Sequence, residues 1–311
     1  MPPTHNTPEI IGIQARLKNL GLHLGLHGDV TYLMRLLYTF DGFLARLANS
    51  AYHDRLVLGG GLFLWKVTLG LQSSRPTQDA DFTCLWPVPA DANGLRAVLQ
   101  QIVAVPAADP LMFAVHDIAL HPILQGRPDL GQRARLPVYL GKAQQVLSLD
   151  LTFGTALLGA PQLRQIPTTL DPSVTIPVLT YPLESVMAGK VAAALKHGAQ
   201  NTRYKDYFDL YLLAQSQDFN GTGLYCALAL ISQAEGFALD ATNEVFASPG
   251  FLTDPVQLAG WAAFVRITNK VRAVVMPDFA TALTLVRALY VPVLTGAAQG
   301  QIWDHTTQRW R

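Results

Sequence analysis

Two aspartates, Asp79 and Asp81, stand two residues apart in a short run that is typical of a β-strand. Residues two apart on a strand point to the same side, so the two carboxylates would share one face. Two like charges this close repel each other unless a cation offsets them, and their hard oxygens suit Mg²⁺ or Mn²⁺. The pair predicts a divalent-cation site, and the alternative is an ordinary solvated turn.

Three consecutive glycines, residues 59–61, follow the apolar run 55–58. Glycine lets backbone amides approach a phosphate without a side chain in the way, which would suit a nucleotide held beside the cation. The run is not a P-loop, because Leu64 and Trp65 stand where that motif requires glycine and lysine. It is not a dinucleotide fingerprint either, and the alternative is a plain turn.

A third carboxylate is available on another expected strand. In residues 146–153 apolar and polar residues alternate, so Ser148, Asp150 and Thr152 share one face while leucines fill the other. Asp150 could therefore join the aspartate pair.

A second group of charged residues follows a proline-rich stretch. Lys190 lies among alanines, and Asp206 and Asp209 share a face of the helix expected over 204–216. Structural explanations also exist for them. Acids in a first turn favour the helix dipole, Lys205 and Asp209 have the spacing of an i,i+4 pair, and Lys190 could extend to the surface.

The elements that must position these residues follow from hydrophobic periodicity. The pattern predicts a mixed α/β N-terminal domain and a helical C-terminal domain, with Asp29 capping a helix in the region 10–52. The expected strands cover residues 55–58, 79–85, 133–140 and 146–153. The expected helices cover residues 62–69, 95–105, 183–197, 204–216, 222–235, 255–275 and 278–293.

The prolines at 161, 167, 172, 177 and 182 mark a domain boundary or crossover. We therefore expect an N-terminal domain over residues 10–165 and a C-terminal domain over residues 175–311. The polar tail 303–311 is expected to be frayed.

Composition limits the class of protein. Of 311 residues 50% are hydrophobic and only 14% are charged, with 23 basic against 22 acidic residues. Such a chain can bury a large core, which excludes global disorder and a uniformly basic nucleic-acid surface. Two cysteines give neither a disulfide framework nor a metal quartet. No apolar run reaches the ~18–20 residues of a membrane span, and no secretory signal is visible, so a cytoplasmic protein is expected.

An RNA partner would need a local positive patch, since the formal net charge is +1. The alternative is a set of solvated loop charges. The candidate residues are Arg127, Arg133, Arg135, Lys142, Arg203 and Lys205.

Taken together and in order, these motifs resemble the AbiEii/MenT nucleotidyltransferase toxins. The resemblance rests on residues 57–61, 75–82, 188–190 and 205–212, and spans roughly 30–215. It implies an α+β fold with a polymerase-β-like nucleotidyltransferase domain and a helical C-terminal domain. It also implies a toxin of a bacterial toxin–antitoxin system that uses Mg²⁺ or Mn²⁺ and an NTP. The acceptor would be RNA, a tRNA 3′ end in the MenT branch, and the partner a cognate antitoxin.

The same resemblance assigns roles to individual residues. The implied catalytic residues are Asp79, Asp81, Asp150, Lys190 and Asp209, the first three as metal ligands. The implied nucleotide-binding residues are Gly60, Gly61, Arg75, Lys190, Lys205 and Asp206. Two departures stand out: Leu58 occupies a position where the family often has lysine, and residues 188–190 read Ala-Gly-Lys rather than Ala-Glu-Lys.

Thr77, two residues before Asp79, is a candidate regulatory position. Phosphorylation would add about −1.5 to −2 charges beside the metal carboxylates, and the alternative is a turn hydroxyl. Two other functions remain open, a non-catalytic or regulatory nucleotide-binding protein and a protein-modifying nucleotidyltransferase.

Overall fold

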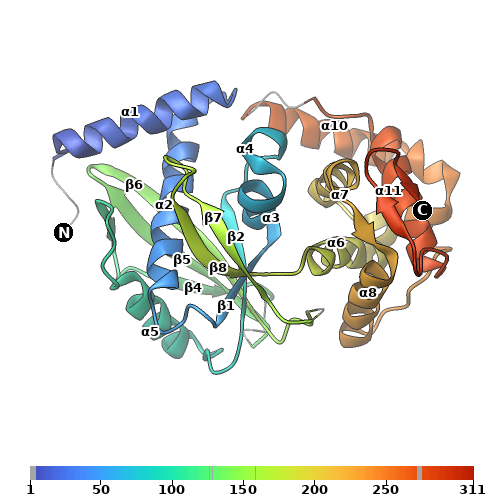
Figure 1. Cartoon of the computed structure of the whole chain (residues 1–311), viewed down its shortest axis with the longest axis horizontal. Helices are drawn as coiled ribbons and strands as arrows, with labels where there is room; N and C mark the ends of the chain where they lie inside the picture. Colours follow the sequence, from blue (N-terminus) through green and yellow to red (C-terminus); the bar gives the residue numbers. More distant parts are fainter. Residues whose placement is uncertain (1–4, 126, 128, 158, 272–274) are drawn as a thin grey trace. The chain divides into compact units, whose positions relative to one another are not determined.

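The computed structural model describes residues 5–125, 127, 129–157, 159–271 and 275–311 (Figure 1). The chain divides into two compact units. The first comprises mainly Met1–Thr155 and Pro161–Thr180, and the second mainly Tyr181–Lys270 and Val274–Arg311. In the described residues no helix combines the length and the apolar character needed to span a membrane.

The first unit is built on a mixed sheet. Its strands are β1 (Leu56–Gly59), β2 (Asp79–Cys84), β3 (Leu111–Phe113), β4 (Ala119–Pro122), β5 (Gly131–Leu140), β6 (Ala143–Phe153), β7 (Gln162–Pro167) and β8 (Thr175–Thr180). Seven of them follow the order β3-β5-β6-β2-β1-β8-β7, and β4 pairs with β5. Strands β2 and β6 are parallel, as are β1 and β8, whereas β1 and β2 are antiparallel. The register places Gly59 of β1, Asp81 of β2 and Asp150 of β6 side by side.

Helices cover the sheet of the first unit. They are α1 (Pro8–His23), α2 (Val30–Ala48), α3 (Gly60–Phe63), the π-helical segment Leu64–Thr68, α4 (Gly70–Ser73) and α5 (Ala92–Val103). The predicted cap of α2 is confirmed, since Asp29 Oδ1 accepts a hydrogen bond from Tyr32 N at 2.9 Å. The Phe43 ring of α2 contacts the Phe82 ring of β2, with centroids 6.0 Å apart. Because side chains alternate along a strand, Asp79 and Asp81 lie on the sheet face away from α2.

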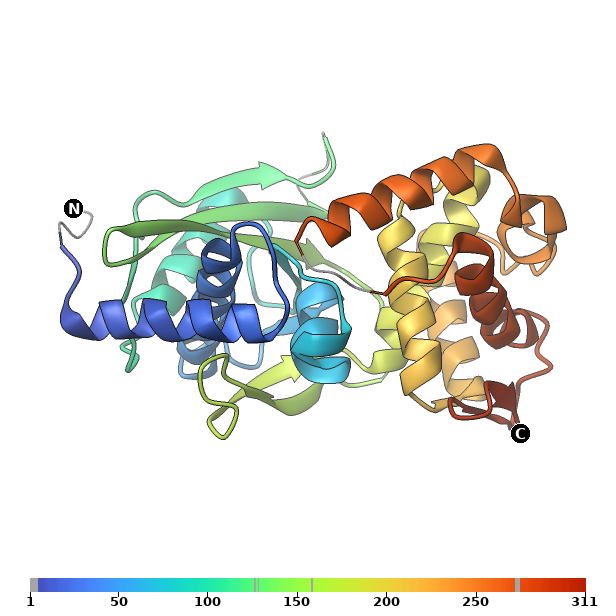
Figure 2. The same cartoon turned by 90° about the horizontal axis from the view of Figure 1, so that it is seen from above.

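The second unit is mainly helical. Its helices are α6 (Leu183–His197), α7 (Tyr204–Ser216), α8 (Gly221–Glu235), α9 (Glu244–Ala247), α10 (Pro255–Asn269) and α11 (Phe279–Leu294) (Figure 2). Aromatic rings fill its core, where Phe279 contacts Tyr207 and Trp261 at centroid distances of 6.0 and 5.6 Å. A mixed sheet in one unit and helices in the other confirm the predicted α+β class.

The proline-rich stretch is not a simple crossover, because β7 and β8 form an antiparallel hairpin within it. The prolines are tolerated because β7 is an edge strand and β8 contacts β1 through one register pair, Leu58 and Thr180. The hairpin adds two strands to the first unit's sheet.

The expectation of a frayed tail is wrong. The tail forms β10 (Ile302–Asp304) and β11 (Arg309–Trp310), which join β9 (Phe219–Asn220) in a small sheet. Trp303 is fully buried, and its Nε1 donates to the carbonyl oxygen of Ala214 at 2.8 Å. Burial of one large ring outweighs the polar composition around it. The helix expected to 275 ends at Asn269, and residues 272–274 lie outside the described residues.

Candidate functional site

Three predicted carboxylates lie on adjoining strands of the first unit. Asp81 on β2 is paired with Asp150 on β6, and Gly59 on β1 is its partner on the other side. Directly paired residues point to the same face, and neighbouring strands lie about 4.8 Å apart. Asp79 follows the same face of β2, about 7 Å further along the strand. The fold therefore gathers the two aspartates of the pair and Asp150 on one face, as the sequence predicted.

The glycine turn lies against this acidic face. Gly60 has a φ of +63°, a conformation that favours glycine. A Cβ on Gly60 would lie 1.7 Å from Asp81 Oδ2. The Asp81 carboxylate therefore rests directly over the backbone of the turn, and any side chain at residue 60 would displace it.

Thr77, in the segment before β2, forms a hydrogen bond at the acidic face. Its hydroxyl donates to Asp79 Oδ1 at 2.6 Å, and the residue is 5% exposed. A Cβ on Gly61 would lie 3.0 Å from Thr77 Oγ1 and 3.5 Å from an Arg75 guanidinium nitrogen. The turn and the segment before β2 thus form one arrangement in which Asp79 is oriented by a hydroxyl.

Arg133 forms an ion pair with Asp150 on this face. It is the register partner of Asp150 on β5, and its Nε and one terminal nitrogen each lie 2.6 Å from an Asp150 oxygen. The bidentate hydrogen bond to Asp150, with the charges of Asp150, Asp79 and Asp81, raises the pKa of Arg133 against the effect of burial. The positive charge of the Arg133 guanidinium is therefore stabilised by all three carboxylates.

The donor set fits a divalent cation held by two carboxylates. Asp79 and Asp81 offer hard oxygen atoms on one face, and Mg²⁺ commonly uses one or two carboxylates together with substrate phosphates. Although all three aspartates are described residues, their oxygens do not all lie within 4.8 Å of one another. Arg133 occupies both oxygens of Asp150. Metal ligation by Asp150 therefore remains a prediction, in which a cation would share the carboxylate with Arg133 or replace it.

Arg135 lies on the same face of β5 as Arg133, two residues further along, and is paired with Ser148 of β6. Because Ser148 is also the partner of Asp79, Arg135 lies near the acidic face. Among the other cations of the expected RNA patch, Lys142 is exposed and Arg127 pairs with Asp129 at 2.9 Å. Arg135 is exposed, and in the described part of the chain it has no ion pair.

The second unit holds the other predicted charged group, and it is buried. Lys190 on α6 is 8% exposed, and its Nζ donates to Asp206 Oδ1 at 2.9 Å and to Asp209 Oδ2 at 2.8 Å. Asp206 and Asp209 on α7 are 1% and 2% exposed. Lys190 therefore does not extend to the surface, because two carboxylates compensate its charge inside the unit.

A further cation lies at the edge of this buried cluster. Arg203 Nε lies 2.6 Å from Asp206 Oδ2, although that contact lacks hydrogen-bond geometry. Lys205 is exposed, and Asp209 pairs with Lys190 rather than in the i,i+4 arrangement with Lys205. The cluster thus has an interior part, Lys190 with the two aspartates, and an exposed part, Arg203 and Lys205.

The predicted residues therefore divide into two groups, one in each unit. The first unit holds Gly60, Gly61, Arg75, Thr77, Asp79, Asp81 and Asp150. The second holds Lys190, Lys205, Asp206 and Asp209. The pairing of Arg133 with Asp150 was not predicted from the sequence. The alternation of polar residues in 131–135 is a signal for this face, but it does not identify a partner across the strands.

Comparisons with known proteins give one family match and similar solved structures. A family model described as nucleotidyl transferase AbiEii toxin, type IV toxin–antitoxin system, matches residues 42–284. The crystal structure of JHP933 from Helicobacter pylori is similar to the chain, with a TM-score of 0.50, 16% identity, and coverage of 88% of this chain and 98% of that one. A second H. pylori structure, described as a candidate nucleotidyltransferase, has a TM-score of 0.45 and 17% identity over 82% of this chain and 93% of that one. None of the curated proteins matches the sequence.

Proposed function

Because the chain belongs to the AbiEii family of nucleotidyltransferase toxins of type IV toxin–antitoxin systems, we propose that it transfers a nucleoside monophosphate from an NTP to the 3′ end of a tRNA with Mg²⁺ or Mn²⁺. The observation that supports this is the acidic face of the first unit. There Asp79 and Asp81 lie on one side of β2, and the Asp81 carboxylate rests on the Gly60 backbone. Two oxygen ligands are thus beside the glycine turn.

In the proposed reaction the RNA 3′ hydroxyl oxygen attacks the α-phosphorus of the NTP. A new P–O bond forms, the bond to pyrophosphate breaks, and the hydroxyl proton passes to a carboxylate or water. When bound, the cation neutralises the triphosphate charge, and Asp79 and Asp81 hold it. The hydroxyl of Thr77, 2.6 Å from Asp79, fixes the orientation of that carboxylate. The glycine turn contributes amides and excludes side chains.

Asp150 has two candidate roles in this proposal, as a third metal ligand or as the acceptor of the hydroxyl proton. Both require one of its oxygens, and Arg133 donates to both of them, so either role would share the carboxylate with Arg133 or displace it. Arg133 is 47% exposed at its side chain, so it has room to exchange Asp150 for a substrate phosphate. We propose that Arg133 makes this exchange when the triphosphate binds.

Lys190 and Asp209 keep their proposed importance, but their geometry favours a positioning role. Lys190 has two carboxylate partners, so contact with a nucleotide phosphate would require it to give up at least one of them. Arg203 and Lys205 are exposed and are the cations of this cluster that a phosphate reaches without breaking the buried pairs. We propose that Lys190 holds α7 in place while Arg203 and Lys205 contact phosphate.

The RNA acceptor is expected to bind a small surface, because the formal net charge of the protein is only +1. Arg133 and Arg135 on β5 supply positive charge beside the carboxylates. A tRNA acceptor and a cognate antitoxin would place the protein in the cytoplasm. At Thr77 phosphorylation would have to break a buried hydrogen bond to Asp79, so we propose that any such regulation acts on an open form of this segment.

The experiment that tests the proposal incubates the protein with each labelled NTP, Mg²⁺, and either tRNA or total cell protein. Label on the tRNA 3′ end supports the proposal. Label on protein would replace it with a protein-modifying transferase, and NTP binding without label would indicate a regulatory nucleotide-binding protein. The Asp79→Asn variant is the matched control, and it should label neither acceptor.

A further inference from the structure

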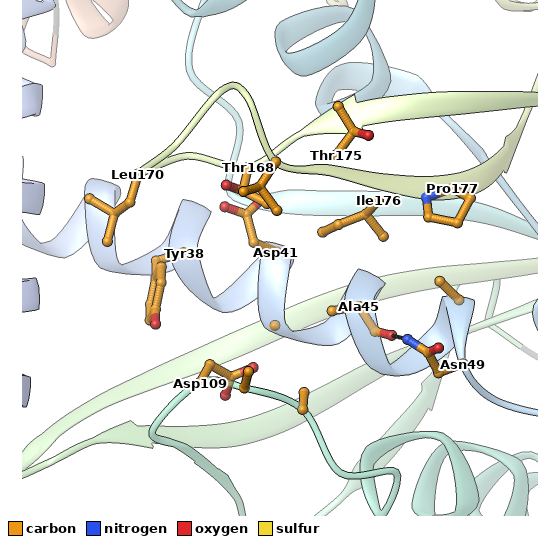
Figure 3. A pocket seen from close by; sticks show the side chains of 15 residues that line it. Tyr38, Asp41, Ala45, Asn49, Asp109, Thr168, Leu170, Thr175, Ile176 and Pro177 are labelled. Carbon is orange, nitrogen blue, oxygen red and sulfur yellow. Dashed lines mark hydrogen bonds between the residues drawn. The ribbon is translucent and has the colours of Figure 1, made fainter.

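The first unit contains a cavity that is separate from the acidic face. It has a volume of about 360 Å³ and lies between α2, the loop that includes Asp109, and the β7–β8 hairpin. Figure 3 shows Tyr38 and Asp41 on α2, with Asp109 on one side and Thr168 on the other. The acidic face is on the side of the sheet opposite α2, whereas the cavity borders α2 itself. Its volume is in the range of small-molecule sites.

The charged residues that line the cavity are acidic. Asp41 and Asp109 line it, whereas their partner cations do not. Asp41 Oδ1 accepts a hydrogen bond from Lys66 Nζ, and Asp109 accepts two from Arg46, at 2.7 and 3.1 Å. Backbone amides add one donor to each, Thr169 N to Asp41 Oδ2 and Leu111 N to Asp109 Oδ1. Because a carboxylate oxygen has two lone pairs, both oxygens of Asp41 and Oδ2 of Asp109 can still accept a further donor. The cavity therefore presents the negative ends of two buried ion pairs.

Tyr38 adds one polar group that has no protein hydrogen bond in the described part of the chain. Burial, followed by the charges of Asp109 and Asp41, raises the pKa of Tyr38 to about 12. The hydroxyl is therefore neutral at physiological pH and can accept or donate a hydrogen bond. The remaining wall is largely apolar and includes Ala45 and Ile176.

We propose that this cavity binds a small organic ammonium ligand with an apolar body. Its ammonium group would bind the Asp41 carboxylate, with Asp109 and the Tyr38 hydroxyl adding negative potential in the same cavity, and its apolar body would lie against Ala45 and Ile176. An anionic ligand, such as a nucleotide, would face two carboxylates and is excluded by charge. A neutral ligand of the same shape would lose the charge-assisted hydrogen bonds. The inference concerns a second site and is independent of the transferred nucleotide.

A ligand bound in this cavity would affect the conformation of the glycine turn through Lys66. Lys66 is 6% exposed and lies in the π-helical segment that continues α3 from Gly60. Its Nζ also donates to Thr169 Oγ1 at 3.1 Å, while Thr169 N donates to Asp41 Oδ2 at 2.6 Å. A ligand ammonium at Asp41 competes with Lys66 for the same carboxylate. The buried triad of Asp41, Lys66 and Thr169 thus connects the cavity wall with the helix that begins at the turn.

The test is calorimetric titration of the full-length protein with n-hexylammonium, n-hexanol and hexanoate. We expect n-hexylammonium to bind near 1 mM, as seven non-hydrogen atoms allow. Hexanol should bind at least about tenfold more weakly, and hexanoate should not bind. Equal binding of the three probes, or no binding of n-hexylammonium at 20 mM, would overturn the proposal.

Two pairs of variants locate the binding. Ala45→Leu should fill the cavity and abolish binding, whereas Ala15→Leu on an exposed part of α1 should not. Tyr38→Phe should weaken binding several-fold, whereas Tyr32→Phe, on the same helix but outside the cavity, should leave it unchanged. Thermal unfolding checks that each variant is folded. Undiminished binding by a folded Ala45→Leu variant would place the ligand elsewhere and overturn the assignment.

The connection to the glycine turn has its own readout. Hydrogen exchange of amides 60–69 should change when n-hexylammonium saturates the wild-type protein. The measurement needs neither NTP nor RNA, so a failure of nucleotide transfer would not affect it. If exchange changes only at the cavity walls, the proposed connection through Lys66 is wrong.

Discussion

The two charged groups of this protein differ in how their charges are compensated. On the acidic face of the first unit, Asp79, Asp81 and Asp150 stand beside Arg133, whose side chain is 47% exposed. In the second unit Lys190, Asp206 and Asp209 are each at most 8% exposed and directly paired. Half-buried carboxylates can bind a cation from solvent, whereas a buried cluster of ion pairs resists any change of its members. The first is suited to binding a ligand, and the second to holding a helix.

The largest effect is expected at the acidic face. Asp81→Asn should lower the rate of nucleotide transfer by at least about a thousandfold, since metal-ion stabilisation of charge amounts to several kcal/mol. Its thermal unfolding temperature should stay close to that of the wild type, because the carboxylate serves binding more than packing. Single-turnover transfer and calorimetry measure the two quantities. A variant with full activity would show that Asp81 is not a metal ligand.

The buried cluster should respond in the opposite way. Lys190→Met leaves two buried carboxylates without their shared cation, and such a break costs about 3–5 kcal/mol of unfolding free energy. Lys205→Met, one residue from Asp206 but exposed, should cost less than about 0.5 kcal/mol. Urea unfolding compares the two variants. If both variants are equally stable, the cluster does not hold the second unit together.

Substitutions at two glycines distinguish the effect of backbone strain from that of the contact between Gly60 and Asp81. Gly60→Ala introduces a positive-φ alanine and a Cβ that meets Asp81, whereas Gly70→Ala has the same backbone problem, with φ +77° and no atom within 4 Å. Gly70→Ala should lose about 1–2 kcal/mol of stability, and Gly60→Ala at least as much because its Cβ also displaces Asp81. Only Gly60→Ala should also lose transfer, by about a hundredfold. Equal activities of the two variants would contradict a functional role for the Asp81 contact.

Arg133 provides a test of competition for Asp150. Arg133→Gln removes the guanidinium from both Asp150 oxygens and one positive charge from the face. Its affinity for Mn²⁺ without NTP should rise about three- to tenfold, measured by electron paramagnetic resonance. Arg127→Gln, which breaks only the exposed pair with Asp129, serves as the control. A weaker affinity for Mn²⁺ in Arg133→Gln would show that Arg133 supports the metal site instead of competing with it.

The smallest effect is expected at Arg135. Arg135→Gln should raise the KM for tRNA about threefold and reduce the salt dependence of binding by about one unit of slope, since one phosphate contact is lost. The kcat should be unchanged. An unaltered salt slope would remove Arg135 from the RNA surface.

The sequence predicted which residues would gather on the first unit's sheet because strand alternation is a local property. The shared face of Asp79, Asp81 and Asp150 depends on period-two patterns that can be read directly. Arg133 could not be assigned to Asp150, because their pairing depends on the register of β5 and β6. That register is set by the hairpin and by burial across the whole sheet.

The pairing of the Lys190 charge with Asp206 and Asp209 also could not be predicted from local sequence patterns. A lysine among alanines is compatible with a surface position or a buried pair, and the choice depends on how α6 packs against α7. The C-terminal tail shows the same limit, since the fixed position of Trp303 depends on the distant carbonyl of Ala214. The sequence-based domain boundaries at residues 165 and 175 remain a prediction.

The most direct test of the central claim measures metal binding at the aspartate pair. Mn²⁺ binding is followed by electron paramagnetic resonance with a non-hydrolysable NTP, in the wild type and in an Asp79→Asn, Asp81→Asn double variant. We predict that the wild type binds Mn²⁺ together with the nucleotide and that the folded double variant does not. Equal Mn²⁺ binding by the two proteins would contradict the assignment of these aspartates as the metal site.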